Sequence, residues 1–205
     1  MAIPRTMVFL DAENLVFRYQ AMLQEGWLPN NDVVHIPDVL VWHPSMTQVF
    51  GYANVGRVYL YTSMVGDDAA LRTMKRRIAD ITYEYKYAIQ DIGTAQIVPV
   101  VFKKQAKNHK SRQVDISITI DMMRFAHNPS IDLLVLASGD GDYLPLVQEV
   151  MRYGKEVYVG AFSSGLAADL CHSVDEFFNL NKLFFVEPVA KDVNKPAKSA
   201  KGKRR

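Results

Sequence analysis

Short apolar runs alternate with amphipathic segments along most of the chain. The run at 7–10 ends in Asp11, which predicts a buried strand with a carboxylate at its C-terminal end. Runs of the same character predict further strands at 58–61, 97–102, 131–137 and 157–161. Pro99 within one of them indicates a strand at the edge of a sheet. An apolar stretch at 177–186 closes the pattern.

Helices are expected between these strands, at 14–25, 67–91, 114–126, 142–153 and 166–172. Residues 67–91 show the clearest helical period, from Leu71 to Ala88, with Gly93 as the expected C-cap. Residues 114–120 also alternate as a strand would, but they merge into 121–126 without a turn signal, which favours a helix. The segment 26–51 carries three prolines and gives no clear pattern. Strands alternating with helices indicate an α/β fold of three layers around a mostly parallel central sheet.

The charge pattern divides the chain into two parts. From Val189 onward it holds seven Lys or Arg and one acid, so this end carries +6 and the preceding part −4. Few apolar residues remain there to bury, so we expect one domain over 1–187 and a disordered basic tail over 188–205. Such a tail is typical of a nucleic-acid contact or simply of a solubilising end.

Composition excludes several classes of protein. No apolar run approaches the roughly 20 residues that span a bilayer, so no membrane association is expected. The first residues lack the apolar region of a secretory signal. A lone cysteine, Cys171, can form neither an internal disulfide nor a zinc cage. These features predict a cytoplasmic protein. The sequence allows a homo-oligomer but does not require one.

Aspartates follow two of the expected strands. Asp11 ends the first strand, and Asp140 and Asp142 come directly after 131–137. In a parallel sheet, ligands bind beyond the carboxyl ends of the strands. Clustered carboxylates repel one another unless a cation or raised pKa values compensate, and Mg²⁺ or Mn²⁺ are suitable cations. Gly139 and Gly141 would allow a sharp turn and the close approach of a ligand.

Each of these residues also has a structural explanation. Asp115 and Asp142 could cap the helices that follow them, and Asp-Gly-Asp is a common turn sequence. The combination is more specific than its parts, because Asp11-x-x-Asn14 follows one strand and Ser-Gly-Asp-Gly-Asp at 138–142 follows another.

Together these segments resemble the NYN-domain branch of the PIN-like nucleases. The matching stretches are VFLDAENL at 8–15, Val114-Asp115 with Asp121 six residues on, and DLLVLASGDGDY at 132–143. Further matches at 145–147, 154–157, 163–166 and 175–177 follow in collinear order, so the resemblance extends to about Val186.

This resemblance implies a PIN-like α/β sandwich, a divalent-metal site and hydrolysis of RNA. It implies that the metal ligands are Asp11, Asp115, Asp140 and Asp142. Asn14 would then position the phosphate or the metal-bound water. Asp121 lies on another face of the same helix, so it would support the metal ligands through contacts behind them rather than bind the metal itself. Ser138 would have the same supporting role. One metal ion, or two, would activate a water molecule, so no protein nucleophile is needed.

A basic segment leads into Asp115. Five of the ten residues at 103–112 are basic: Lys103, Lys104, Lys107, Lys110 and Arg112. A charge run is usually a solvated loop. The position of this basic segment directly before an acidic metal site favours binding to the phosphate backbone of RNA.

Three functional hypotheses are therefore compared. The first is a metal-dependent ribonuclease, of endo or exo mode, favoured because all four acids and Asn14 are present. The second is a non-catalytic RNA-binding or regulatory module with the same fold. The third, a phosphatase of the haloacid dehalogenase type, needs Asp-x-Asp at the first strand, whereas this chain has Asp11-Ala12-Glu13.

Overall fold

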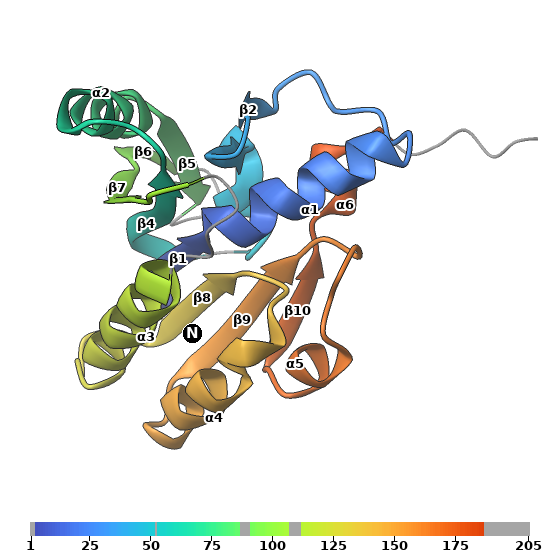
Figure 1. The fold of residues 1–205 in the computed structure, drawn as a ribbon. Helices are drawn as coiled ribbons and strands as arrows, with labels where there is room; N and C mark the ends of the chain where they lie inside the picture. The colour runs from blue at the N-terminus through green and yellow to red at the C-terminus, as the bar shows by residue number, and fades with distance from the viewer. Residues whose placement is uncertain (1–2, 52, 87–90, 107–111, 187–205) are drawn as a thin grey trace, which may run out of the picture.

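Six parallel strands form the central sheet, in the order β10-β9-β8-β1-β4-β7 (Figure 1). Their bounds are β1 Arg5–Asp11, β4 Asn54–Met64, β7 Val98–Lys103, β8 Leu133–Ala137, β9 Glu156–Ala161 and β10 Glu176–Asn179. Every pairing between them is parallel, which confirms the predicted sheet and the PIN-like sandwich. β7, which carries Pro99, lies at an edge as predicted.

The structure is a computed structural model that describes residues 3–51, 53–86, 91–106 and 112–186. The expectations for the tail at 188–205, for Ala88, and for Lys107 and Lys110 lie outside the described residues. Within the described parts, no helix has the length and the apolar character needed to cross a membrane.

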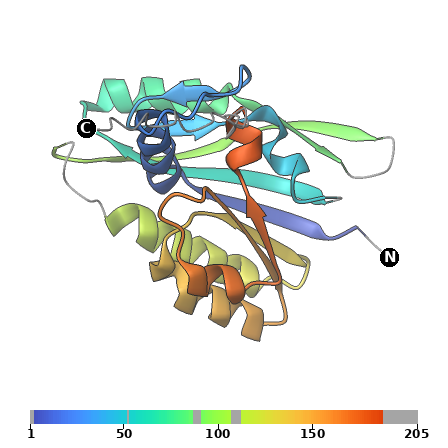
Figure 2. The same cartoon turned by 90° about the vertical axis from the view of Figure 1, so that its right-hand side faces the viewer.

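Helical layers cover both faces of the sheet (Figures 1 and 2). One layer holds α3 Arg112–Ala126, α4 Leu144–Arg152 and α5 Ala168–His172. The other holds α1 Ala12–Gln24, α2 Asp68–Ala79 and α6 Asn181–Phe184, together with two small hairpins. Since both faces are covered, the central strands are apolar on both sides and read as continuous runs rather than as alternating ones.

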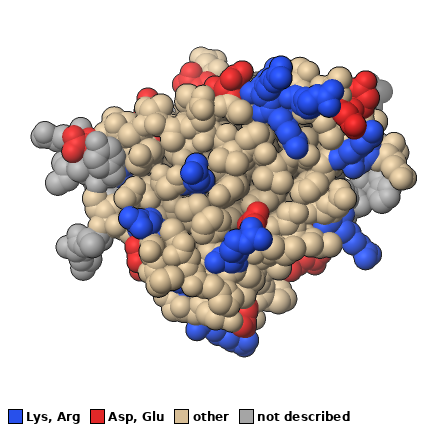
Figure 3. Space-filling model, turned by 90° about the vertical axis from the view of Figure 1, so that its left-hand side faces the viewer, with Lys and Arg blue, Asp and Glu red and all other residues tan. Residues whose placement is uncertain are grey.

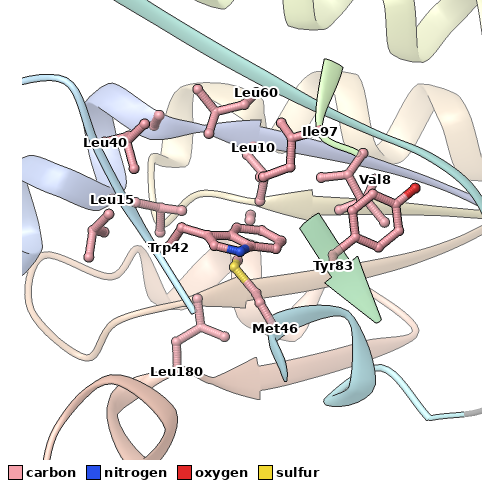
Figure 4. Close-up of a cluster of buried hydrophobic side chains, with 14 of the residues drawn as sticks. Val8, Leu10, Leu15, Leu40, Trp42, Met46, Leu60, Tyr83, Ile97 and Leu180 are labelled. Carbon is pink, nitrogen blue, oxygen red and sulfur yellow. The ribbon is translucent and has the colours of Figure 1, made fainter. Parts of the chain in front are cut away.

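Strand β1 shows how the two cores are divided. Val8 and Leu10 pack into the core under α1, whereas Met7 and Phe9 pack into the core under α3 and α4. Successive side chains of a strand point to opposite faces, so Asp11 continues the row of Met7 and Phe9. Figure 4 shows part of the first core, where the fully buried Trp42 lies among apolar side chains from strands, helices and hairpins.

The order of the strands also creates a topological switch point between β1 and β8. From β1 the chain moves to β4 on one side, and it later returns to β8 on the other side of β1. The connections that leave β1 and β8 therefore diverge over opposite faces of the sheet. Ligands of open α/β sheets bind at such a switch point, beyond the carboxyl ends of the strands.

The helix predicted at 67–91 is shorter than expected. α2 ends at Ala79, and β5 Thr82–Lys86 then pairs with β6 Ile92–Gln96 in an antiparallel hairpin. The alternating tyrosines of this segment suit a strand better than a helix. Gly93 is not a C-cap: it lies opposite Tyr85 in the hairpin, and an added Cβ there would lie 2.3 Å from the tyrosine ring. The ring thus covers the glycine across the strands.

The segment 26–51, which gave no clear pattern, contains a second hairpin. β2 Val34–Ile36 pairs with β3 Leu40–Trp42, and a 3-10 helix, η1 Pro44–Gln48, follows. The turn between these strands uses Asp38 at a φ of 60°. The apolar side chains of the segment 26–51 pack into the core beneath α1, so this segment completes one layer of the domain.

Candidate active site

Asp11 is the last residue of β1 and also the N-cap of α1. Its Oδ1 accepts the backbone N–H of Asn14 at 3.0 Å, and its Oδ2 accepts the hydroxyl of Ser138 at 3.0 Å. The side chain is buried, and burial raises the pKa of its carboxyl to about 7 despite these two hydrogen bonds. Asp115 and Glu13 raise the pKa further by repulsion. Removal from water disfavours the charged form of the carboxyl, so a bound cation would stabilise this carboxylate.

The loop after β8 is tied to the start of α1. The backbone N–H of Gly139 donates to Oδ1 of Asn14 at 3.1 Å, and the backbone N–H of Asp140 donates to Oγ of Ser138 at 3.2 Å. Ser138 thus links Asp11 to the backbone of Asp140. An added Cβ at Gly141 would lie 3.0 Å from the Cβ of Ala167, so glycine allows this loop to pack against the loop after β9.

Tyr143 contacts one of the acids directly. It is buried, and its hydroxyl donates to Oδ1 of Asp115, in the first turn of α3, at 3.2 Å. Burial raises the pKa of the Tyr143 hydroxyl, and the charges of Asp11, Asp115 and Asp140 raise it further. The Tyr143 hydroxyl therefore contacts Asp115 directly and lies within electrostatic range of Asp11 and Asp140.

The other two predicted acids differ in their surroundings. Asp142 is exposed in η2 Gly141–Tyr143, where its backbone N–H donates to Oδ1 of Asp140 at 3.1 Å. Asp121 accepts the hydroxyl of Tyr61 at 2.8 Å and the guanidinium of Arg124 at 2.7 Å, so it ties α3 to β4. Within the described residues, no group of three or more His, Cys, Asp or Glu side chains is gathered closely enough to hold a metal ion.

A further network lies at the same edge of the sheet. Glu13, in the first turn of α1, accepts the hydroxyl of Ser63 near the end of β4. Nζ of Lys104, just beyond β7, lies 3.7 Å from the same carboxylate. The sequence patterns alone do not single out Glu13, Ser63 or Tyr143. The signal for Glu13 and Tyr143 was present, because both lie inside the matched motifs.

The basic segment is only partly described. Lys104 has a side chain that is 13% exposed and joins the network of Glu13. Lys103 is 56% exposed and pairs with Asp68 of α2 at 3.4 Å. Arg112 begins α3 on the surface. Figure 3, viewed from the side of α2, shows Lys and Arg gathered mainly along its upper edge and otherwise scattered. Lys104 is thus the described lysine of this segment that lies at the candidate site.

A solved structure supports the fold. A protein of unknown function from Vibrio parahaemolyticus superimposes with a TM-score of 0.58 and 17% identity, over 90% of this chain and 97% of that one. At this identity the likeness shows the fold alone.

Sequence comparison adds a relative and a family. An uncharacterised protein of Methanocaldococcus jannaschii is 23% identical over 114 residues, which cover 56% of this chain. The match spans about half, 48%, of that relative's length. The family model described as the NYN domain matches residues 5–181, which include both strand-end motifs and most of the described chain. The chain therefore belongs to the NYN domain family, as the resemblance of its motifs predicted.

Proposed function

We propose that this protein is a metal-dependent nuclease that hydrolyses phosphodiester bonds in RNA. The family implies a nuclease fold. The observation that carries the proposal is the buried carboxyl of Asp11, with its pKa raised to about 7, at the switch point of the sheet. A carboxylate held in such a place needs a cation to be stable in its charged form. Asp115, which accepts the hydroxyl of Tyr143, and Asp140 lie within electrostatic range of the same tyrosine as Asp11.

The chemical type of the donors suits a hard divalent cation. The atoms available are carboxylate oxygens of Asp11, Asp115, Asp140 and Asp142, with amide and hydroxyl oxygens nearby. Mg²⁺ and Mn²⁺ prefer such oxygen ligands, whereas softer metals prefer nitrogen and sulfur. These aspartates would hold the ion. When bound, it would lower the pKa of a coordinated water and neutralise charge on the scissile phosphate.

The protein's own groups orient this set. The hydrogen bonds from Asn14 and Ser138 fix both oxygens of Asp11. The hydroxyl of Tyr143 occupies one oxygen of Asp115 and thereby fixes the rotation of that carboxylate. Lys104, beside Glu13, places a positive charge at the edge of the cluster, where it would meet a phosphate of the RNA.

A second candidate function is a non-catalytic RNA-binding or regulatory module. It is favoured by one observation: Asp115 accepts the hydroxyl of Tyr143, and the described residues contain no group of three or more acidic, histidine or cysteine side chains close enough to hold a metal ion. Both candidates predict RNA binding, so only a cleavage assay separates them.

Purified protein is expected to degrade end-labelled single-stranded RNA in Mn²⁺ or Mg²⁺, and to leave it intact in EDTA. Products would be resolved on denaturing gels, with the Asp140→Asn protein prepared in parallel to reveal contaminating ribonuclease. Equal degradation by that variant, or in EDTA, would contradict the proposal. Binding without cleavage in either metal would support the non-catalytic module instead.

Tyr143→Phe is expected to lower kcat about tenfold with little change in KM. It removes a hydrogen bond that orients Asp115, and such a bond to a charged group contributes roughly 1.5 kcal/mol. Steady-state cleavage of the labelled RNA measures both constants. The control is Tyr153→Phe, because Tyr153 is 45% exposed at the far end of α4. A wild-type kcat for Tyr143→Phe would show that this hydroxyl does not position the site.

A further inference from the structure

One large aromatic side chain on α1 points away from the core. The buried residues of this helix, among them Leu15, Tyr19 and Met22, form a single stripe. Phe17 lies on the opposite side and is 63% exposed. Single exposed apolar residues are common on protein surfaces, so the exposure of Phe17 has meaning only together with its neighbours.

Its neighbour Arg18 is unusual in its contacts. The Cζ atom of Arg18 lies 5.4 Å from the centre of the Phe17 ring, which is within the range of a cation–π contact. The Nε atom of Arg18 is buried, and it has no hydrogen-bond partner among the described residues. Burial of an N–H without a partner is costly, and a guanidinium binds phosphate readily. Since Nε itself is closed to solvent, an anion at this side chain would be met by the positive charge and the outer N–H groups of the guanidinium.

The backbone beside Arg18 is shaped to admit its guanidinium. Gly165, in the loop after β9, has a φ of +65°. A Cβ at this position would lie 2.0 Å from the Cζ of Arg18, so any other residue would displace the guanidinium. The guanidinium group of Arg18 thus lies between the Phe17 ring and the backbone at Gly165, which carries no side chain.

This pair adjoins the candidate active site. Arg18 lies four residues after Asn14, which puts both on one side of α1, about 6 Å apart along the helix axis. Asn14 binds the backbone of Gly139, and the carbonyl of Gly139 accepts the N–H of Ala167 at 3.1 Å. Asn14, the loop of Asp140, the loop of Gly165 and Arg18 are therefore linked by direct contacts at the carboxyl edge of the sheet.

We propose that Phe17 and Arg18 bind one nucleotide of single-stranded RNA next to the scissile phosphate, with its base stacked on Phe17 and its phosphate held by Arg18. This inference rests on the proposed function. A base can stack on an aromatic ring only when its own face is free, which excludes a base inside a duplex. The pair therefore selects unpaired RNA, or the unpaired parts of folded RNA, without reading the sequence.

The test uses the full chain with Asp140→Asn, so that RNA stays intact, and measures the Kd for a labelled single-stranded 12-mer and for its duplex. Adding Phe17→Ala is expected to raise the Kd for the single strand about tenfold to a hundredfold, the range for loss of one stacked base. The Kd for the duplex should change little. Phe17→Trp should restore tight binding, and its indole fluorescence should fall when the 12-mer binds.

Arg18→Gln is expected to weaken single-strand binding and to lower the slope of log K against log salt by about one phosphate contact. The matched control is Leu28→Ala, because Leu28 is 67% exposed beyond the end of α1. The melting curves of the Phe17 and Leu28 variants should coincide with that of their parent, since neither residue belongs to the core.

The outcomes separate this inference from the proposed function. If the wild type cleaves RNA in Mn²⁺ but Phe17→Ala binds the single strand as tightly as its parent, the stacking site is overturned and the nuclease proposal stands. An equal loss for duplex and single strand also overturns it, because stacking requires an unpaired base. If the wild type neither binds nor cleaves RNA, the proposed function fails first, and this inference fails with it.

Discussion

Asp140→Asn is expected to reduce RNA cleavage by roughly 10³-fold and to leave the protein folded. A carboxylate that binds a catalytic metal contributes several kcal/mol to stabilisation of the transition state, which corresponds to such a factor. Asparagine keeps an oxygen that can accept the backbone N–H of Asp142, now bound to Oδ1 of Asp140 at 3.1 Å. Removal of one charge also relieves repulsion around Tyr143, so the melting temperature without metal should be equal or higher.

The measurement combines single-turnover cleavage with melting curves in EDTA and in Mn²⁺. RNA binding through Lys104 and its basic neighbours should largely persist in this variant, because those contacts do not depend on the chemistry. Asp169→Asn, on the exposed side of α5, serves as the control for loss of a surface charge. If Asp140→Asn unfolds, the residue is a structural turn residue. If it cuts at the wild-type rate, Asp140 is not part of the catalytic centre.

The second large effect concerns Asp11 and pH. The folded pKa of about 7 lies above the ordinary value of 3.8, so the folded state retains a proton that the unfolded state has lost. Stability in EDTA should therefore fall as the pH rises from about 4 to 7 and should level off above that. The contribution of Asp11 to this loss is on the order of 4 kcal/mol.

Asp11→Asn should remove most of this pH dependence and should be the more stable protein at pH 8 in EDTA. Its amide oxygen can still cap α1 by accepting the N–H of Asn14, since Asn is as good an N-cap as Asp. Urea denaturation at pH 5 and pH 8 measures the difference. The variant should also lose any stabilisation that Mn²⁺ gives the wild type.

Asp67→Asn is a matched control for the loss of a carboxylate at a helix cap. Asp67 caps α2 through the N–H of Ala70 at 2.8 Å, as Asp11 caps α1, but it is exposed. Its substitution should change stability little between pH 5 and pH 8. If Asp11→Asn is destabilised equally at both pH values, the carboxyl acts through its hydrogen bonds and not through its buried charge.

The sequence itself predicted the elements whose character is local. Parallel strands covered on both sides are continuous apolar runs, so β1, β8 and β9 were recognised, as was α3 with its helical face. The neighbourhood of Asp11, Asn14 and Asp140 also followed from local information, because acids at the ends of parallel strands meet at one edge of the sheet. Pro99 predicted the edge strand, because proline has no backbone N–H to donate to a second neighbouring strand.

Only the tertiary structure decided the features that depend on distant partners. Thr82–Lys86 is a strand because Ile92–Gln96 pairs with it, although its apolar residues also fit the period of the preceding helix. The hairpin at 34–42 forms where α1 provides an apolar surface to cover. The bond from Tyr143 to Asp115 spans 28 positions, and the contact of Arg18 with Gly165 joins α1 to the loop after β9. Such pairs leave no period in the sequence, because their members are brought together only by the packing of the layers.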